Sequence, residues 1–424
     1  MSAALPADHP ARLRLNNEVH ARPPEPLEAP SLVSYLALLC DQAQRDASFR
    51  AVAEAALRYG VPPPAEGANH FSGDFGVFRM KWERHTEFVR YTFIVTGDAH
   101  PTALAAVPAE WVAALPGDML VAAHVTLAPP GTDPLELARR VFARDSVVGS
   151  AVADGAATVF ADFRILADGF SRMLVGDVRL TPWQAGRVVQ GLLEIDTYRM
   201  MALLALPLAQ SVAPIITRRE QELAGITAAM VTAGDADEPL LLDRLTRLAA
   251  EIDSRHADSL YRFGAAAAYY ELVQRRIQDL RETRLVGLQT LHEFTERRLA
   301  PAMNTCQTIA ARQEELSRRI ARGTQLLATR VGVTRERQNQ ALLETMNRRV
   351  RLQLRLQSTV EGLSIAAVTY YIVGLVGYAA KGLEAAGSRL DPAIAMAISI
   401  PIVGGFMPFG LRKLRRHVEL ADRP

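Results

Sequence analysis

The chain has 424 residues, of which 49% are hydrophobic and 22% charged, and its formal net charge is +2. This length has room for two or three domains, and the composition is that of a folded protein rather than a disordered one. The charge is too small, and the arginines too dispersed, for a nucleic-acid-binding protein, so we expect no nucleic acid partner. Cys40 and Cys306 match no metal or redox spacing, which predicts two free thiols in a reducing compartment.

Residues 1–30 form a proline-rich arm that contains no apolar segment of the kind a secretory signal needs. Its sequence LNNEVHARP is the densest polar cluster in the chain. In an extended segment, alternate side chains project from one side, which could bind an anion or perform acid–base chemistry. Alternatively, hydrogen bonds and a Glu18–Arg22 pair hold the arm on its domain. The candidate ligand-binding residues in this arm are Asn16, Asn17, Glu18, His20 and Arg22.

Residues 31–180 are predicted to form an α/β domain with a mixed or mainly antiparallel sheet. We expect a helix over about 31–59, because Gly60 and the prolines that follow would end it. Alternation of apolar and polar residues over 77–85 and 88–95 predicts a β-hairpin. The remaining expected elements are helices at 109–115 and 134–142 and strands at 119–127, 147–152, 157–165 and 170–175.

Two further polar clusters lie within these elements. In KWERHTE, Glu83 and His85 share one face of a predicted strand, and a carboxylate beside a histidine can orient or charge the imidazole. The alternative is an ordinary exposed strand face. In LLEIDTYRMM, Glu194 and Tyr198 share a helical face and Arg199 is spaced to pair with Asp196, which is also what an ordinary helix surface provides.

Residues 181–361 show helical periodicity and are predicted to form a long stalk. Thr181 and Pro182 begin it, Pro207 and Pro214 should kink or split it, and residues 232–238 form a loop. Further helical regions are expected over about 239–298 and 302–361. Apolar residues in the last region keep a broken three–four spacing, which indicates either packing within one helical bundle or a coiled-coil stalk of an oligomer.

Residues 362–411 contain two uncharged apolar runs, 363–380 and 392–411, each of roughly the 20 residues needed to cross a bilayer as a helix. We predict a transmembrane hairpin with the lipid bilayer as its partner. Arginines precede the first run, and the tail 412–424 is basic, so both termini are expected in the cytoplasm of a bacterial inner-membrane, multi-pass protein. The alternative is a buried soluble hairpin. A stripe on the first run suits helix contact or, less simply, a pore lining: Ala366, Tyr370, Gly374 and Gly377.

Standard catalytic patterns are missing from the sequence. It contains no phosphate-binding loop, dinucleotide fingerprint, His-Glu-x-x-His or Gly-x-Ser-x-Gly motif, and its nine histidines are scattered. We therefore assign no catalytic residue, no cofactor and no metal site.

Several long motifs resemble a bacterial family of uncharacterised proteins, labelled a domain of unknown function or predicted membrane-anchored protein. They are LNNEVHARP, KWERHTEF, LLEIDTYRMMALLALP and the C-terminal TVEGLSIAAVTYYIVGLVGY. The resemblance covers nearly the whole chain and implies a two-span anchor without an assigned activity. The architecture is also similar to that of CorA-type magnesium channels, but GYAAKGLEAAG stands where their Gly-Met-Asn signature follows the first span.

Three hypotheses follow from the sequence. The first is a non-enzymatic, membrane-anchored scaffold or sensor that forms a homo-oligomer. The second is a CorA-like transporter or channel. The third is a membrane-tethered enzyme or ligand-binding protein that uses the NNEVHARP segment together with Glu83 and His85. The ligand, whether a small molecule or an ion, is not identified by the sequence.

Overall fold

The structure is a computed structural model that describes residues 8–13, 15–16, 23–142, 147–387 and 391–421, with the backbone alone described for 408–421. The chain divides into two compact units. The first comprises residues 1–232 and 240–324, and the second comprises residues 233–239 and 325–424.

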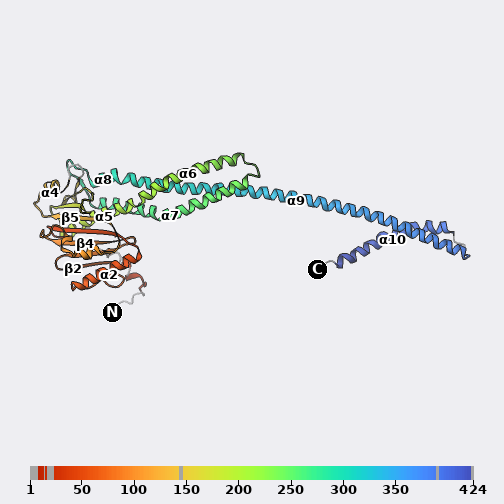
Figure 1. Ribbon diagram of the computed structural model, residues 1–424, viewed down its shortest axis with the longest axis horizontal. Coiled ribbons are helices and arrows are strands. Elements are labelled where there is room, and N and C mark those ends of the chain that lie inside the picture. The colour runs from red at the N-terminus through yellow and green to blue at the C-terminus, as the bar shows by residue number, and fades with distance from the viewer. Residues whose placement is uncertain (1–7, 14, 17–22, 143–146, 388–390, 422–424) are drawn as a thin grey trace, which may run out of the picture. The chain divides into compact units, whose positions relative to one another are not determined.

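The first unit is built on a mixed sheet (Figure 1). In the described part of the chain this sheet has nine strands in the order β2–β3–β4–β1–β5–β8–β7–β6–β9. Neighbouring strands are antiparallel except β5 and β8, which are parallel. This confirms the predicted mixed sheet. The strands are β1 Ser31–Leu39, β2 His70–Asp74, β3 Arg79–Arg84, β4 Phe88–Thr96, β5 Asp118–Ala128, β6 Val148–Val152, β7 Ala157–Ala161, β8 Ser171–Asp177 and β9 Thr283–Arg284.

The predicted helix over 31–59 is wrong in its first third, because residues 31–39 form the central strand β1. This strand pairs with β4 on one side and β5 on the other, and residues 33–38 are all buried. A strand covered on both faces carries apolar residues at consecutive positions and loses its alternation. The helix α2 (Gln42–Arg58) begins later, where Asp41 and Gln44 form a capping box.

Helices cover both faces of the sheet. On one face, Trp82 and Phe93 belong to a core that also contains Val52 and Ala56 of α2. The 3₁₀ turn η1 (Ala103–Ala106) and the short helix α3 (Ala109–Ala113) border this core. On the other face lies α5 (Pro182–Leu203), in which Thr197 hydrogen-bonds the Tyr35 hydroxyl of β1 at 2.7 Å. The predicted helix after Asp133 is confirmed as α4 (Pro134–Val141).

The long helical region is interrupted at two places. α6 (Ala205–Thr232) is separated from α5 at Leu204, which is consistent with Pro207 having no N–H to donate to the carbonyl of Leu203. α7 (Glu238–Asp279) ends well before the predicted Arg298. Arg281 has a positive φ of 48°, and the chain then forms β9 before α8 (Leu291–Arg298) begins at its Thr290 cap. Neither this break nor the short strands β2 and β9 were predicted from the sequence.

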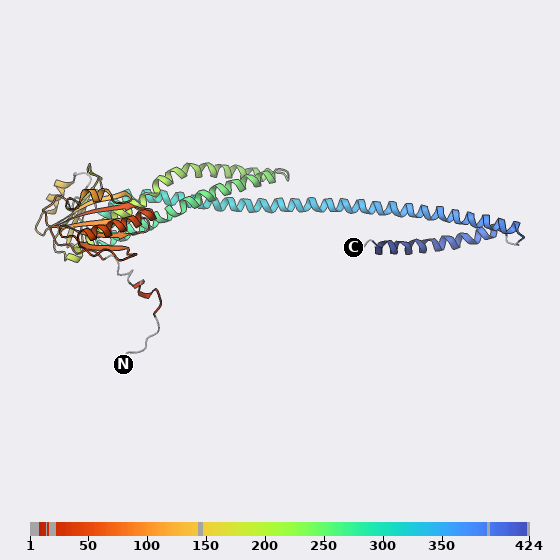
Figure 2. The ribbon, with the colours of Figure 1, turned by 60° about the horizontal axis from the view of Figure 1, so that its bottom comes forward.

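Within the first unit, α6, α7 and the beginning of α9 (Ala300–Ala385) run beside one another (Figures 1 and 2). Arg312 of α9 binds Glu220 of α6, and Ser317 donates to Asp253 of α7 at 2.7 Å. Leu299, just before α9, is buried, and so are apolar seam residues of this part of α9, among them Met303, Cys306, Leu316 and Ile320. Packing within the chain's own helices therefore accounts for the seam up to residue 324.

The second unit contains the rest of α9 and α10 (Pro392–Ala421), and each of these helices includes one predicted span. By length and composition, two described stretches could cross a membrane, 182–232 and 300–385, and residues 392–407 form a shorter apolar helix. The apolar window within 182–232 is 33% buried. The apolar window of α9 is only 11% buried, so nothing in the described chain covers most of it.

Candidate functional site

The sheet face beneath α5 is polar but buried. Side chains alternate along β3 and β4, so that Met80 and Trp82 enter the α2 core while Lys81, Glu83 and Arg90 point toward α5. Glu83 is 1% exposed and Arg90 is 4% exposed. The expectation of an ordinary exposed strand face is therefore wrong for Lys81 and Glu83, because α5 covers them.

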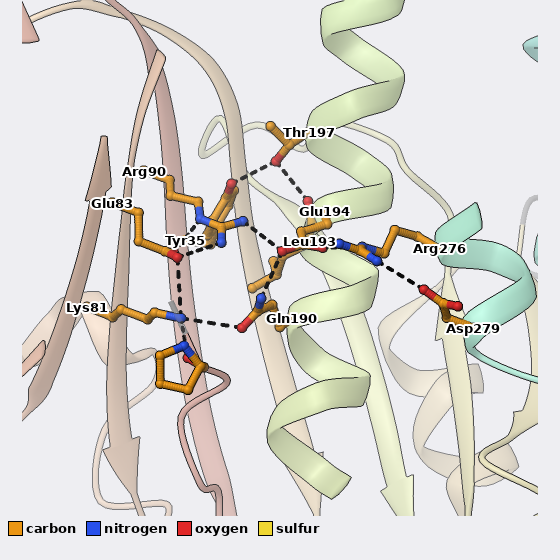
Figure 3. Close-up of polar contacts among 11 residues, drawn as sticks. Tyr35, Lys81, Glu83, Arg90, Gln190, Leu193, Glu194, Thr197, Arg276 and Asp279 are labelled. Atoms are coloured by element: carbon orange, nitrogen blue, oxygen red, sulfur yellow. Dashed lines mark hydrogen bonds and ion pairs between the residues drawn. The ribbon is translucent and has the colours of Figure 1, made fainter. Parts of the chain in front are cut away.

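These residues form an ion-pair network that joins the sheet to two helices (Figure 3). Arg90 donates to both carboxylate oxygens of Glu83, from Nη2 at 2.8 Å and from Nε, and its Nη1 reaches Glu194 of α5 at 3.1 Å. Glu194 also accepts hydrogen bonds from Gln190 at 2.8 Å and from Arg276 of α7. One arginine thus bridges two carboxylates that lie 111 positions apart in the sequence, on different layers of the fold.

The network keeps its members charged. Burial alone would raise the pKa of Glu83 and of Glu194, but the Arg90 guanidinium outweighs this, and the pKa of each carboxyl lies below its ordinary value. Burial would lower the pKa of Arg90, but Glu83 reverses this and holds it well above the ordinary value. Two carboxylates locked in the ionised state by arginine cannot donate a proton, so this arrangement holds elements together and does not supply a general acid.

Lys81 connects the network to the N-terminal arm. Its Nζ donates to the carbonyl oxygen of Pro23 at 2.6 Å and lies 3.4 Å from Glu83 Oε1. Burial lowers the pKa of this lysine, which is a property shared with some catalytic lysines. The cavity beside it measures only about 30 Å³, however, far below the roughly 300–1,000 Å³ of small-molecule sites. A substrate therefore has no room at Lys81 in this conformation.

A larger pocket of about 500 Å³ opens at the β3–β4 turn, and we call it the hairpin pocket. Its walls come from α2, the turn, α5 and α7. The polar lining residues are Gln42, Arg45, Asn69, Arg84, His85 and Thr86, and the remaining ones are Phe88, Tyr198, Tyr269 and Leu272. The rings form two stacked pairs, His85 on Phe88 at 4.4 Å and Tyr198 on Tyr269 at 5.8 Å between centroids. Two of the polar sequence clusters, KWERHTE and LLEIDTYRMM, therefore meet in this pocket.

The predicted site residues are placed differently by the fold. Glu83 lies in the ion-pair network and His85 lies in the hairpin pocket, so the structure does not bring these two into one cavity. Asn16 lies in a helical turn and is exposed. The remaining arm candidates, Asn17, Glu18, His20 and Arg22, lie outside the described residues.

The residues of the predicted membrane stripe also differ in their surroundings. A Cβ on Gly377 would lie 2.4 Å from the sulfur of Met396, so α9 approaches α10 closely at this glycine. Gly374 is half-buried, and Ala366 and Tyr370 are exposed. The role of the exposed pair in helix contact stays a prediction.

Sequence reasoning missed several residues that matter here, above all Arg90, Arg276 and Arg45. A signal existed for Arg90, since a lone arginine inside the apolar strand FVRYTFIVT is expected to have a buried partner. Arg276 and Arg45 offered none, because each sits on an ordinary polar helix face. Among the described residues, no group of three or more His, Cys, Asp or Glu side chains is arranged to hold a metal ion.

Comparison with curated proteins and with solved structures gave no match. One family does match, and its description gives no activity. Because the match extends over residues 7–418, nearly the whole chain, this protein belongs to the DUF3422 family, described as a protein of unknown function.

Proposed function

We propose that this protein is anchored in the bacterial inner membrane by the apolar parts of α9 and α10, and that the rest of the chain acts as a scaffold or sensor in the cytoplasm. The observation that carries the proposal is the exposure of uncharged residues 363–380 on α9. Leu363, Tyr370 and Leu375 are each more than 65% exposed. Apolar surface of this extent is unfavourable in water, at about 25 cal/mol per Å², and favourable in a bilayer.

The charges that flank the two runs support a specific topology. Arg348, Arg349, Arg351 and Arg355 precede the first run, and four basic residues follow the second within residues 412–416. The connection 381–391 has no basic excess. Since cytoplasmic flanks are rich in arginine and lysine, both termini are proposed to face the cytoplasm and the connection to face outward.

An apolar stripe on α9 supports a homo-oligomer. No residue between 328 and 376 is buried in the single chain. Over this stretch, Leu342, Met346, Leu356, Val360 and Leu363 fall on the alternating three- and four-residue steps of a coiled-coil seam. Copies that enter a membrane from the same side are necessarily parallel, which places identical residues at the same height. The polar Arg349 and Gln353 occupy intervening seam positions and weaken the seam.

Anchoring and topology are tested together. The protein should stay in the membrane fraction after alkaline carbonate washing. Burial raises the pKa of Cys40 to about 11 and raises the pKa of Cys306 above its ordinary value, so both native thiols should react slowly with maleimide. In that background, Ala386→Cys should react with a membrane-impermeant maleimide in spheroplasts, and Arg351→Cys should react only after lysis. Protein released by carbonate would contradict anchoring, and labelling of Arg351→Cys before lysis would contradict the topology.

The oligomer is tested by cysteine cross-linking in membranes. Met346→Cys lies on the proposed seam, and Arg348→Cys lies two residues later, about 200° around the helix. Oxidation should yield a covalent dimer for Met346→Cys and little for Arg348→Cys. Equal yields of covalent dimer for the two variants would contradict the proposed seam. Ion conduction is not proposed, because no observation on the described residues favours it.

A further inference from the structure

The hairpin pocket has the charge of an anion site. Its lining residues include two arginines, Arg45 and Arg84, and no aspartate or glutamate. The acidic residues near it are already paired. Glu87 accepts hydrogen bonds from Arg262 and, at 3.0 Å, from Tyr269, while Asp46 pairs with Arg84 at 3.2 Å. Arg84 and Arg262 are thus paired with carboxylates, whereas Arg45 forms no ion pair in the described part of the chain.

Both arginines are positioned by the protein and keep donors for a ligand. Arg45 Nη1 donates to the Cys40 carbonyl at 3.0 Å and to that of Thr86, and Nη2 donates to Gln42 at 2.6 Å. Arg84 donates from Nε and Nη2 to the Asn69 side-chain oxygen, at 3.2 and 3.0 Å. A guanidinium has five N–H donors. With the Asp46 contact included, each arginine uses three of them and retains two.

One residue of the pocket has a hydroxyl without a protein partner. Tyr198 is 8% exposed, and its hydroxyl forms no hydrogen bond with another residue in the described part of the chain. The hydroxyl oxygen itself stays accessible to water, which satisfies it when no ligand is bound. A ligand oxygen in the pocket that this residue lines would take the place of that water. The ring of Tyr198 is held by its stack on Tyr269, so the hydroxyl is presented in a fixed position.

The other walls of the pocket are aromatic or apolar. His85 and Phe88 form one stacked pair and Tyr198 and Tyr269 form another, with Leu272 beside them. A volume of about 500 Å³ is in the range of small-molecule sites. Guanidinium groups recognise carboxylates and phosphates, and aromatic walls recognise planar rings.

We propose that the hairpin pocket binds a small organic anion, with a carboxylate or phosphate group at Arg45, Arg84 and Tyr198 and a flat ring between the aromatic walls. This proposal does not rest on the membrane anchor or on the oligomer. A full chain that failed to anchor could still bind the anion, so failure of either proposal is distinguishable from failure of the other.

The test uses the full chain in detergent and measures the thermal unfolding midpoint from tryptophan fluorescence. The probes are phenyl phosphate and benzoate, with phenol and benzamide as uncharged analogues of similar shape. A ligand that binds only the folded state raises the midpoint, so at about 10 mM either anion should raise it while the analogues do not. Comparing the two anions distinguishes a phosphate site from a carboxylate site.

Two variants locate the binding. Tyr198→Phe removes only the hydroxyl, which bonds no described residue, so this variant should fold normally and bind the anion about tenfold more weakly. Arg84→Gln should weaken binding at least as much. The matched controls are Tyr59→Phe and Arg50→Gln, which change the same residue types outside the pocket and should bind like the wild type. The proposal fails if neither anion raises the midpoint, if the uncharged analogues raise it equally, or if Tyr198→Phe and Arg84→Gln bind like the wild type.

Discussion

Arg90 and Glu83 lie on adjacent strands and pair through two parallel hydrogen bonds on a buried face of the sheet. Arg90 also holds Glu194 of α5, so its removal would leave two buried carboxylates without their main counter-charge. Breaking such a network by removing one partner typically costs about 3–5 kcal/mol. We expect Arg90→Met to lower the free energy of unfolding by this amount, measured by urea denaturation of the full chain in detergent. The control is Arg140→Met, which breaks the exposed Arg140–Glu136 pair and should cost less than about 1 kcal/mol. Equal stability of Arg90→Met and wild type would show that the network does not join sheet and helix energetically.

The close approach of α5 to the N-terminal arm gives a second prediction. A Cβ on Gly186 would lie 1.9 Å from the carbonyl oxygen of Glu25, which is backbone and cannot turn aside. Gly186→Ala should therefore displace the arm and lower the thermal midpoint, although alanine is the better helix former. Gly225→Ala on α6 is the control, because a Cβ there meets nothing within 4 Å and should raise stability by up to about 1 kcal/mol. Hydrogen exchange at the Leu27 amide, which bonds the Pro182 carbonyl at 3.0 Å, would report the displaced arm directly. Unchanged exchange there would argue against the tight contact.

His124 predicts a dependence of stability on pH. Burial and, secondarily, Arg172 lower the pKa of this histidine to about 4, against which Asp168 acts only weakly, and its Nδ1 lies 2.8 Å from the Ser34 hydroxyl. The unfolded chain, with the ordinary value of 6.5, takes up the proton first as pH falls. The contribution of neutral His124 to the free energy of unfolding is therefore fully present above pH 6.5. It is lost progressively down to pH 4, by up to about 3 kcal/mol.

The pH prediction is checked by measuring the thermal midpoint across this range. The carboxyls of Glu83 and Glu194 have lowered pKa values, so their contribution is lost only as pH falls below the ordinary 4.5. Between pH 4.5 and pH 6.5, the change of the midpoint with pH therefore reports His124. His124→Asn should make the midpoint nearly independent of pH in this interval. A wild-type midpoint that does not change between pH 6.5 and 4.5 would contradict a buried neutral histidine.

Local sequence patterns predicted most of the sheet but misassigned its centre. The hairpin of β3 and β4 alternates clearly, because one face meets the aromatic core and the other carries charges. β1 does not alternate, since helices cover both of its faces, and the apolar run SLVSYLALL is equally compatible with a buried helix. Only its pairing with β4 and β5, a property of the whole fold, decides between the two.

Some residues of the candidate site could be identified from the sequence, but their meeting in one pocket could not. His85 and Tyr198 stand in clusters that the sequence makes conspicuous, yet Arg45 and Tyr269 lie on helices with no unusual local pattern. A polar strand face looks the same in sequence whether it meets water or a charged helix. Glu83 is therefore indistinguishable from a surface residue until Glu194, 111 positions later, is brought against Arg90.

Gly377 gives the last prediction, on the contact between α9 and α10. A side chain added there would meet Met396 at 2.4 Å, whereas a Cβ on Gly374, one turn earlier, would meet nothing within 4 Å. Gly377→Val should therefore displace the Met396 side chain and loosen the contact between the helices, while Gly374→Val should leave the contact intact. A looser contact favours local opening, so trypsin should cleave the detergent-solubilised protein after Lys381 faster in Gly377→Val than in Gly374→Val. Valine has a higher helix propensity than glycine, and the change is the same at both sites, so a difference in rate reports packing alone. Equal cleavage rates would mean that the Gly377–Met396 contact does not hold the hairpin closed.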